Sequence, residues 1–456
     1  MSKFKSSLAS VVNKLRLLLL FTLMKSYGNP RRVQAYDLLI FKYLITDRND
    51  ARISPGELRD RWNSSILRTL KGDYQGGKRE RIGIVDLLNS NLQNSNSDRK
   101  LHPEWGQNIG HIGSAMALAI LSKYSHNDKR EIRLTVSSED YCHNLATKVL
   151  GQSLQITSQM SHDFSSSVVQ NWINFDRIWG LLDNSKNYLD YIDLSERVYS
   201  HCDSNKDLYF KLPLNYEDLC MRFLESHDLL LPKYYIALHL RSGRNNRDAR
   251  YCTPRNYEGV IKAAINGGYS VVIFGDCIFD FGFDLPDYNV LDLRTPLQEP
   301  QVLIPYLIRR SKGFISSMSG PAYVAYSLGI PTLTTNSVAP NWSFHATGSK
   351  SFFLPKTWVD ENENIIPFRE VLNSFLGDWA WTSWGSPELK GRKLRENSVA
   401  ELVAASNFFM EALSENASVS NEFDNVLLEM REGSLAHGTG KIVPTYLLGQ
   451  SSTFFD

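Results

Sequence analysis

Residues 312–336, KGFISSMSGPAYVAYSLGIPTLTTN, constrain the fold more than any other stretch of the chain. A short apolar run suited to a buried strand leads into the small polar residues 316–320, and Pro321 then opens a helical segment. Gly329 ends that segment, and a second strand-like run follows. We expect Ser319 to cap the helix, because serine is a preferred N-cap residue. Pro321 is compatible with this, since proline is tolerated in a first turn. Such a turn gathers backbone N–H groups that can bind an anion, although an ordinary strand-to-helix connection has the same pattern.

The second half of the chain repeats this alternation of short apolar runs and helical segments. Five strands are predicted, at residues 234–240, 270–274, 289–293, 313–315 and 330–334. Strands joined by helices or long loops form a parallel, doubly wound α/β sheet. Ligands of such sheets bind at the carboxyl ends of the strands, where the strand order switches.

The remaining sequence divides the chain into four parts. Strands predicted at 81–88 and 131–136, helices at 115–121 and 139–150, and an aromatic, helix-like stretch around 172–182 indicate a first α/β domain. A capping box at Ser398 and Glu401 begins a helix near the C-terminus. We therefore predict a cationic amphipathic segment, an N-terminal α/β domain, a C-terminal α/β domain and a helical tail that packs across the domains. Their bounds are 1–32, 33–210, 211–375 and 376–456.

Two loops at the predicted carboxyl edge carry candidate anion-binding residues. The loop after the first strand of the second half contains four arginines spaced three residues apart. Guanidinium groups bind phosphate oxygens through paired hydrogen bonds. We expect a diphosphate to be bound by Arg241 and Arg244 together with Ser317, Ser319 and Gly320. The alternative is a solvated loop whose arginines pair with acidic neighbours.

Four residues at the same edge are candidates for contacting a nucleotide or sugar. His239 lies inside a strand, where a core histidine is the alternative interpretation. Gly275 and Asp276 end the next strand, and Asp276 either contacts a ribose or caps the following loop. Asn336 ends the last strand of the opening stretch.

A histidine in the first half is a candidate acid–base catalyst. His111 lies in the sequence NIGH, which is predicted to precede the helix at 115–121. An imidazole, with an unperturbed pKa of about 6.5, suits the removal of a proton from a hydroxyl group. A histidine that caps the helix is the alternative.

Composition and missing motifs exclude several classes of protein. The net charge of +1 gives no basic field for nucleic acid, and the five cysteines include no CxxC pair, which fits a reducing cytoplasm. The sequence lacks the GxxxxGK(S/T) pattern of P-loop ATPases and the GxGxxG pattern of dinucleotide-binding domains. It also lacks an Asp-x-Asp motif, so no metal site is expected.

The N-terminal segment has the composition of a membrane-surface helix. Residues 1–32 contain seven Lys and Arg residues and no acidic residue. The apolar run at 17–24 is much shorter than the about 20 residues that cross a bilayer, and no small-x-small cleavage site follows it. We expect this segment to lie in an anionic membrane surface. A helix docked on its own domain is the alternative.

Several of these segments together resemble one family. ALHLRSG at 237–243, GGYSVVIFGD at 267–276, the stretch 314–336 and KIVPTYLLG at 441–449 resemble a bacterial family of GT-B glycosyltransferases associated with surface-polysaccharide biosynthesis. IGHIG at 109–113 and LPL at 212–214 are similar to its weaker N-terminal motifs. The similarity covers about residues 80–450 and is strongest over 235–340.

The resemblance implies a GT-B-like fold, with two Rossmann-like doubly wound domains facing a cleft. It implies a nucleotide-sugar donor held mainly by the C-terminal domain, a glycan or lipid-linked acceptor, and transfer without metal or other cofactor. We expect the protein in the cytoplasm, peripheral on the inner face of the plasma membrane. Two alternatives remain, a nucleotide-sugar epimerase on the same fold and a non-catalytic glycan- or nucleotide-binding module.

Overall fold

The structure is a computed structural model that describes the larger part of the chain beyond residue 98. The described residues are 61, 64, 65, 68, 73, 75–77, 79, 80, 83, 99–101, 109–124, 132–137, 143–159, 172–173, 181–182, 188–189, 202–241, 249–275, 281, 284, 285, 289–294, 300–338, 350–372, 388–389, 391–414 and 442–443. Among them, no helix combines the length and apolar character needed to cross a membrane. The segment 1–32 lies outside the described residues.

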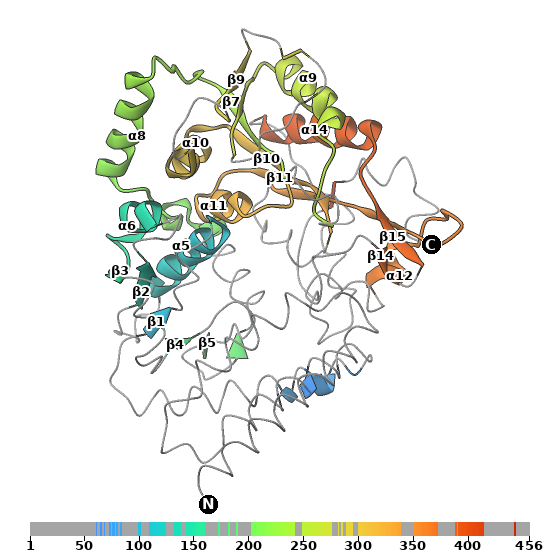
Figure 1. Ribbon diagram of the computed structural model, residues 1–456, viewed down its shortest axis with the longest axis horizontal. Helices are drawn as coiled ribbons and strands as arrows, with labels where there is room; N and C mark the ends of the chain where they lie inside the picture. Colours follow the sequence, from blue (N-terminus) through green and yellow to red (C-terminus); the bar gives the residue numbers. More distant parts are fainter. Residues whose placement is uncertain are drawn as a thin grey trace, which may run out of the picture.

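A six-stranded parallel sheet forms the centre of the second half (Figure 1). Its order is β12-β11-β10-β7-β8-β9, and each strand is parallel to its neighbours. The strands are β7 (Tyr235–His239), β8 (Ser270–Ile273), β9 (Val290–Asp292), β10 (Gly313–Ser317), β11 (Thr332–Ser337) and β12 (Phe352–Pro355). The five predicted strands and their parallel arrangement are confirmed, and β12 is an additional strand.

Helices cover both faces of this sheet. Side chains alternate along β7, so that Tyr235 and Ala237 belong to one buried cluster and Ile236 and Leu238 to another. The first face is covered by α8 (Leu214–Ser226), α10 (Ile304–Arg310) and α11 (Pro321–Ser327). The second is covered by α9 (Glu258–Asn266) and α14 (Val399–Leu413). Short 3-10 helices precede α8, α9 and α10, namely η3 (Lys206–Leu208), η4 (Pro254–Tyr257) and η5 (Pro300–Leu303).

A second, four-stranded parallel sheet lies in the first half, in the order β3-β2-β1-β4. Its elements are β1 (Arg99–Leu101), α5 (Ile109–Tyr124), β2 (Ile132–Ser137), α6 (His143–Leu150), β3 (Gln155–Gln159) and β4 (Trp172–Ile173). Two predictions are wrong here. Gly83, inside the predicted strand 81–88, is helical. The described residues of the stretch 172–182 form β4 and β5 (Leu181–Leu182) instead of a helix, and β5 pairs antiparallel with β6 (Tyr188–Leu189).

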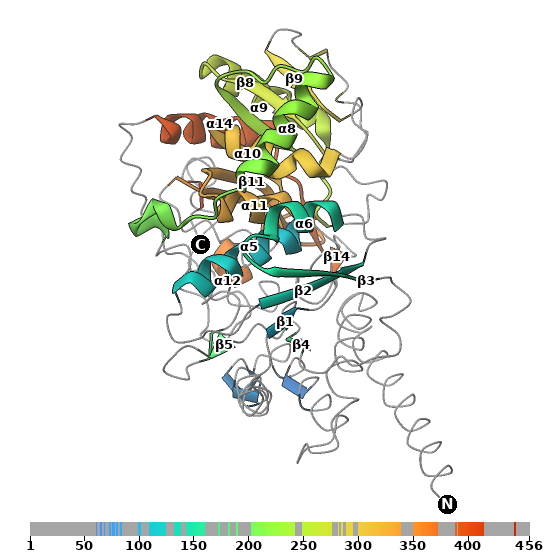
Figure 2. The same cartoon turned by 90° about the vertical axis from the view of Figure 1, so that its left-hand side faces the viewer.

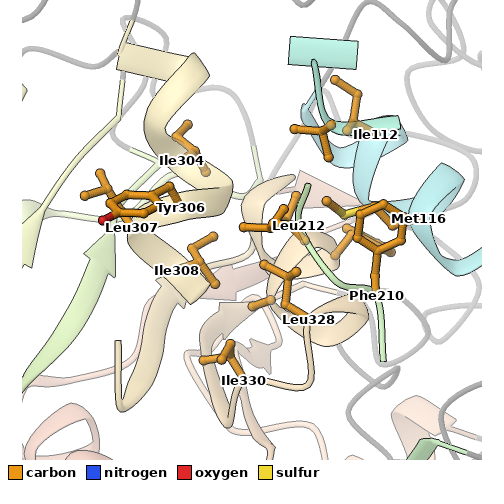
Figure 3. Close-up of a cluster of buried hydrophobic side chains, with 14 of the residues drawn as sticks. Ile112, Met116, Phe210, Leu212, Ile304, Tyr306, Leu307, Ile308, Leu328 and Ile330 are labelled. Carbon is orange, nitrogen blue, oxygen red and sulfur yellow. The ribbon is translucent and has the colours of Figure 1, made fainter. Parts of the chain in front are cut away.

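Helix α5 joins the two sheets by packing against α11. Figure 2 shows α5 and α6 between the four-stranded sheet and the layer that contains α11. Buried side chains of α5, α10 and α11 and of the segment around Phe210 form one continuous cluster (Figure 3). At Gly113 the helices approach so closely that an added Cβ would lie 2.5 Å from the backbone N of Val324. The hydroxyl of Ser327 on α11 donates to the carbonyl of Gly113 over 2.8 Å.

The C-terminal region is not purely helical. Besides α12 (Phe368–Leu372) and α14, it contains an antiparallel sheet of β13 (Thr357–Val359), β15 (Arg392–Arg395) and β14 (Glu388–Leu389). The predicted capping box is confirmed, because Ser398 and Glu401 exchange side-chain and backbone hydrogen bonds at the start of α14. Ile442, within the motif at 441–449, pairs with Phe353 of β12.

Candidate functional site

The candidate site lies where the order of the six-stranded sheet switches. The neighbouring strands β7 and β10 are in register at His239 and Ser316. From β7 the chain passes to α9 on one face, whereas from β10 it passes to α11 on the other face. Two adjacent loops therefore diverge at this point, and ligands of doubly wound sheets bind in such a crevice.

The backbone of Arg241, the first residue after β7, is fixed from two sides. Its N–H donates to Ser317 Oγ over 2.6 Å, and its carbonyl accepts the N–H of Cys252 over 3.3 Å. The Arg241 side chain is half-buried, whereas Ser317 is completely buried. Ser317 therefore fixes the backbone of Arg241, and its predicted contact with a ligand stays a prediction.

His239, Ser319 and Gly275 form a second contact across the same edge. His239 Nδ1 lies 3.0 Å from Ser319 Oγ, and both side chains are 7% exposed. Gly275 has a φ of 136°, and a Cβ there would lie 3.0 Å from His239 Cδ2. The predicted N-cap role of Ser319 is wrong, because Gly320 occupies the N-cap position of α11 and the Ser319 hydroxyl meets His239 instead.

A buried hydroxyl without a partner adjoins this contact. Ser316 Oγ is completely buried and makes no hydrogen bond to any of the described residues. On the same strand face its register neighbours are His239 on β7 and Thr334 on β11, and Thr334 is already paired with the hydroxyl of Tyr326 at 2.8 Å. Unsatisfied buried hydroxyls are rare in folded proteins. Because Ser316 is completely enclosed, no contact with a ligand is assigned to it.

The first turn of α5 reaches this edge from the other sheet. A Cβ on Gly320 would lie 2.8 Å from the backbone N of Gly110, so the two glycines are in backbone contact. The motif IGHIG begins α5 at Ile109, which corrects the prediction that it precedes the helix. His111 follows Gly110 directly, so its backbone lies beside the Gly320 turn, while its side chain is outside what the structure describes.

Asn336, for which a contact with nucleotide or sugar is predicted, has a structural role at this edge. It is completely buried with a left-handed φ of 51°. Its N–H donates to Asn397 Oδ1 over 2.7 Å, and its own Oδ1 accepts the N–H of Asn397 over 2.9 Å. Its amide nitrogen donates to the Tyr257 hydroxyl over 3.0 Å. The Oδ1 end of the side chain thereby holds the start of α14 to the sheet, and the amide nitrogen holds the end of η4.

Two predicted site residues, Arg244 and Asp276, lie outside the described residues. Cys252 and Tyr257 support the site from the second face of the sheet, and no sequence motif predicted this role. Burial raises the pKa of the Cys252 thiol to about 12 and raises the pKa of Tyr257 well above its usual value. Both groups therefore stay protonated near neutral pH.

No protein-family model matches the chain, and no curated protein sequence matches it. Among solved structures, it is similar to the iron-containing dodecameric glycosyltransferase TibC from enterotoxigenic E. coli H10407, with 17% identity over 54% of this chain, 61% of TibC and a TM-score of 0.32. E. coli ADP-heptose LPS heptosyltransferase II matches at 11% identity over 57% of this chain and 90% of its own, with a TM-score of 0.37. UDP-GlcNAc 2-epimerase from Methanocaldococcus jannaschii matches at 9% identity over 50% and 66%, with a TM-score of 0.21. These likenesses are too weak to assign a function.

One comparison corrects the prediction that no cofactor is needed. TibC is described as iron-containing, so a resemblance to glycosyltransferases does not imply transfer without metal, and that prediction is wrong. Among the described residues, no three His, Cys, Asp or Glu side chains are grouped so that they can hold a metal ion. No iron ligands are therefore assigned to that part of the chain.

Proposed function

We propose that this protein is a glycosyltransferase that moves a sugar from a nucleotide-sugar donor to a glycan or lipid-linked acceptor. The observation that carries the proposal is the contact between Gly110 and Gly320 at the switch point of the six-stranded sheet. This contact brings the start of α5, which packs on the four-stranded sheet, to the two loops that hold Arg241 and Ser319. A transferase needs such a point, where a donor held by one unit meets an acceptor held by the other.

Each part of the site has a task in this reaction. As the bond from sugar to diphosphate breaks, negative charge grows on the departing diphosphate. The Arg241 guanidinium and the N–H groups of the Ser319–Gly320 turn stabilise that charge, and fixed donors of this kind usually contribute most to catalysis. The fixed backbone of Arg241 supports such a preorganised role. His111 takes the proton from the acceptor hydroxyl if the reaction inverts configuration.

The proposal also covers the domain arrangement and the cellular location of the protein. Residues 33–210 and 211–375 form the two units of a GT-B enzyme of bacterial surface-polysaccharide synthesis. Its cationic segment, residues 1–32, holds it on the anionic inner face of the plasma membrane. Deleting that segment releases the protein from sedimenting membranes, and unchanged sedimentation would refute the anchor.

The function is tested first by ligand binding and then by turnover. Nucleotides and nucleotide sugars are screened for a rise in melting temperature, because a ligand bound to the folded state stabilises it. The stabilising donor is then incubated alone and with candidate acceptors, with and without added ferrous iron. Sugar transfer supports the proposal. Turnover of the donor alone indicates an epimerase, and binding without any turnover indicates a non-catalytic module.

The Arg241→Ala variant tests the assigned role of the arginine. We expect transfer to fall by about 10²-fold or more, as when one preorganised donor is lost. Arg222→Ala is the matched control, because Arg222 is an exposed arginine on α8 and its loss removes the same charge away from the site. Equal turnover of the two variants would reject the role of Arg241.

A further inference from the structure

The imidazole of His239 touches two neighbouring segments at the carboxyl edge of the sheet, the turn after β10 and the end of β8. The ring projects from the end of β7, and its Nδ1 lies 3.0 Å from Ser319 Oγ in the turn after β10. Its opposite edge lies against Gly275 after β8, where a Cβ would come within 3.1 Å of Nε2. The Phe274 ring packs beside it with a centroid distance of 5.8 Å. The ring is therefore held in one orientation, with Nδ1 directed at the Ser319 hydroxyl.

Whether the Ser319 hydroxyl can donate a hydrogen bond to a ligand depends on whether His239 Nδ1 carries a hydrogen. A hydroxyl has one proton to donate and two lone pairs that accept. If Nδ1 accepts, the only proton of Ser319 is used within the protein. If Nδ1 carries the hydrogen and donates to Oγ, the Ser319 O–H is available to an outside acceptor. An anionic oxygen next to Ser319 favours the second arrangement, because it attracts the hydroxyl proton.

Exposure distinguishes Ser319 from the two serines before it. Ser316 and Ser317 are completely buried, whereas Ser319 is 7% exposed and is followed by the half-buried Gly320. The hydroxyl of Ser317 is also occupied by the backbone of Arg241. Of the three serines, Ser319 alone has both access to the edge and a histidine that can set its direction.

We propose that His239 is a positioning residue that donates from Nδ1 to Ser319 Oγ and so turns the Ser319 O–H toward a phosphate oxygen of a nucleoside diphosphate. This inference rests on the proposed function and assigns the ligand contact to Ser319 instead of His239. The proposal also requires glycine at position 275, because any side chain there would displace the His239 ring. Recognition is directed at the diphosphate and is independent of the base.

The test compares affinities for ADP, GDP, UDP and their unphosphorylated nucleosides by calorimetry. Ser319→Ala is expected to weaken diphosphate binding by about 10- to 100-fold, the loss typical of a hydrogen bond to a charged group. His239→Leu is expected to weaken it to a similar extent. His239→Asn is expected to stay within about 3-fold of wild type, because its amide N–H can replace Nδ1–H. Ser316→Ala is the control and leaves affinity unchanged, and nucleoside affinity is unchanged in every variant.

The double variant Ser319→Ala/His239→Leu separates positioning from direct contact. If His239 acts only through Ser319, the double variant binds as weakly as Ser319→Ala alone. A further loss of about 10-fold, or a His239→Asn variant as weak as His239→Leu, would overturn the proposal. So would wild-type affinity in Ser319→Ala, a small substitution that removes only a hydroxyl. If the wild-type protein binds no nucleoside diphosphate, the proposed function itself fails, which is a different result from normal wild-type binding with unaffected variants.

Discussion

Replacing Gly113 with alanine tests whether α5 and α11 hold the two sheets in a fixed arrangement. The new Cβ would lie 2.5 Å from the N of Val324, 2.6 Å from the C of Tyr323 and 2.7 Å from its Cβ. Carbon atoms pack best at about 3.5–4.0 Å, so the helices must separate by roughly 1 Å. Two of the three atoms belong to the backbone of α11, so a change of rotamer cannot relieve the overlap.

The free energy of unfolding is expected to fall by about 2 kcal/mol. Overpacking of this kind costs about 1–3 kcal/mol, and the rigid backbone contacts place Gly113→Ala toward the upper end. Replacing a glycine inside a helix returns about 0.5–1 kcal/mol, which opposes the loss. For a domain of 150–250 residues the balance corresponds to a melting temperature lower by roughly 4–8 °C. Under the proposed function, separation of Gly110 from Gly320 is also expected to lower sugar transfer, by up to about 10²-fold for a 1 Å displacement.

Thermal and urea unfolding of purified variants measure the effect. Gly83→Ala is the matched control, because Gly83 is helical and, among the described residues, its Cβ would approach only the flexible guanidinium of Arg61, at 3.4 Å. That variant is expected to gain about 0.5–1 kcal/mol. If Gly113→Ala is as stable as wild type while Gly83→Ala is stabilised, the close contact between α5 and α11 does not hold in solution.

Three further predictions concern stability. Ser317→Ala is expected to cost about 1–3 kcal/mol in urea unfolding, because the buried N–H of Arg241 loses its acceptor, whereas Ser316→Ala is neutral or stabilising; equal losses in both would contradict this. Ser398→Ala removes the capping box of α14 and costs about 1 kcal/mol, which the same urea titration measures. Burial raises the pKa of Cys252 from 9.0 to about 12, so its contribution to stability is complete below pH 9 and is lost as pH rises toward 12. Urea midpoints from pH 8 to 11 check this, and Cys252→Ala should show a shallower decline.

The sheet of the second half was predictable because its strands are short, apolar and bounded by residues that end elements. Gly267 and Gly268 close α9 immediately before β8, and Gly329 with Pro331 separates α11 from β11. Parallel strands buried on both faces show continuous apolar runs, so the pattern identifies them directly. The switch point, with Arg241 beside the loop after β10, followed from the same pattern.

The first half was harder because short apolar runs do not distinguish a helix from a strand. The aromatic stretch around Trp172 suggested a helix, but Trp172 lies in the short strand β4 and Leu181 in β5. Gly110 and Gly113 suggested a loop, since glycine weakens helices, yet here they permit close contact with α11. Packing of α5 against α11, about 210 residues later in the chain, overrides the weak helix preference of these glycines. This contact cannot be inferred from the sequence around them.

The roles of individual polar residues were hidden for a similar reason. Ser319 has the residue type and position of a helix cap, but its hydroxyl meets His239, 80 residues earlier. Asn336 is tied to Asn397, 61 residues later. A sequence shows which side chains can form hydrogen bonds, but the fold decides which acceptor lies within reach.

The reciprocal bonds between Asn336 and Asn397 have a consequence for how the protein is made. The sheet face bounded by α9 is not sealed until α14 docks, and α14 ends at Leu413. During translation, a nascent chain that ends just after β12 lacks α14, so Phe352 and its apolar neighbours are expected to be exposed to solvent and to chaperones. Chains that stop before Asn397 leave the buried Asn336 amide without its partner and are expected to be degraded as incomplete products, not to accumulate as a shorter enzyme.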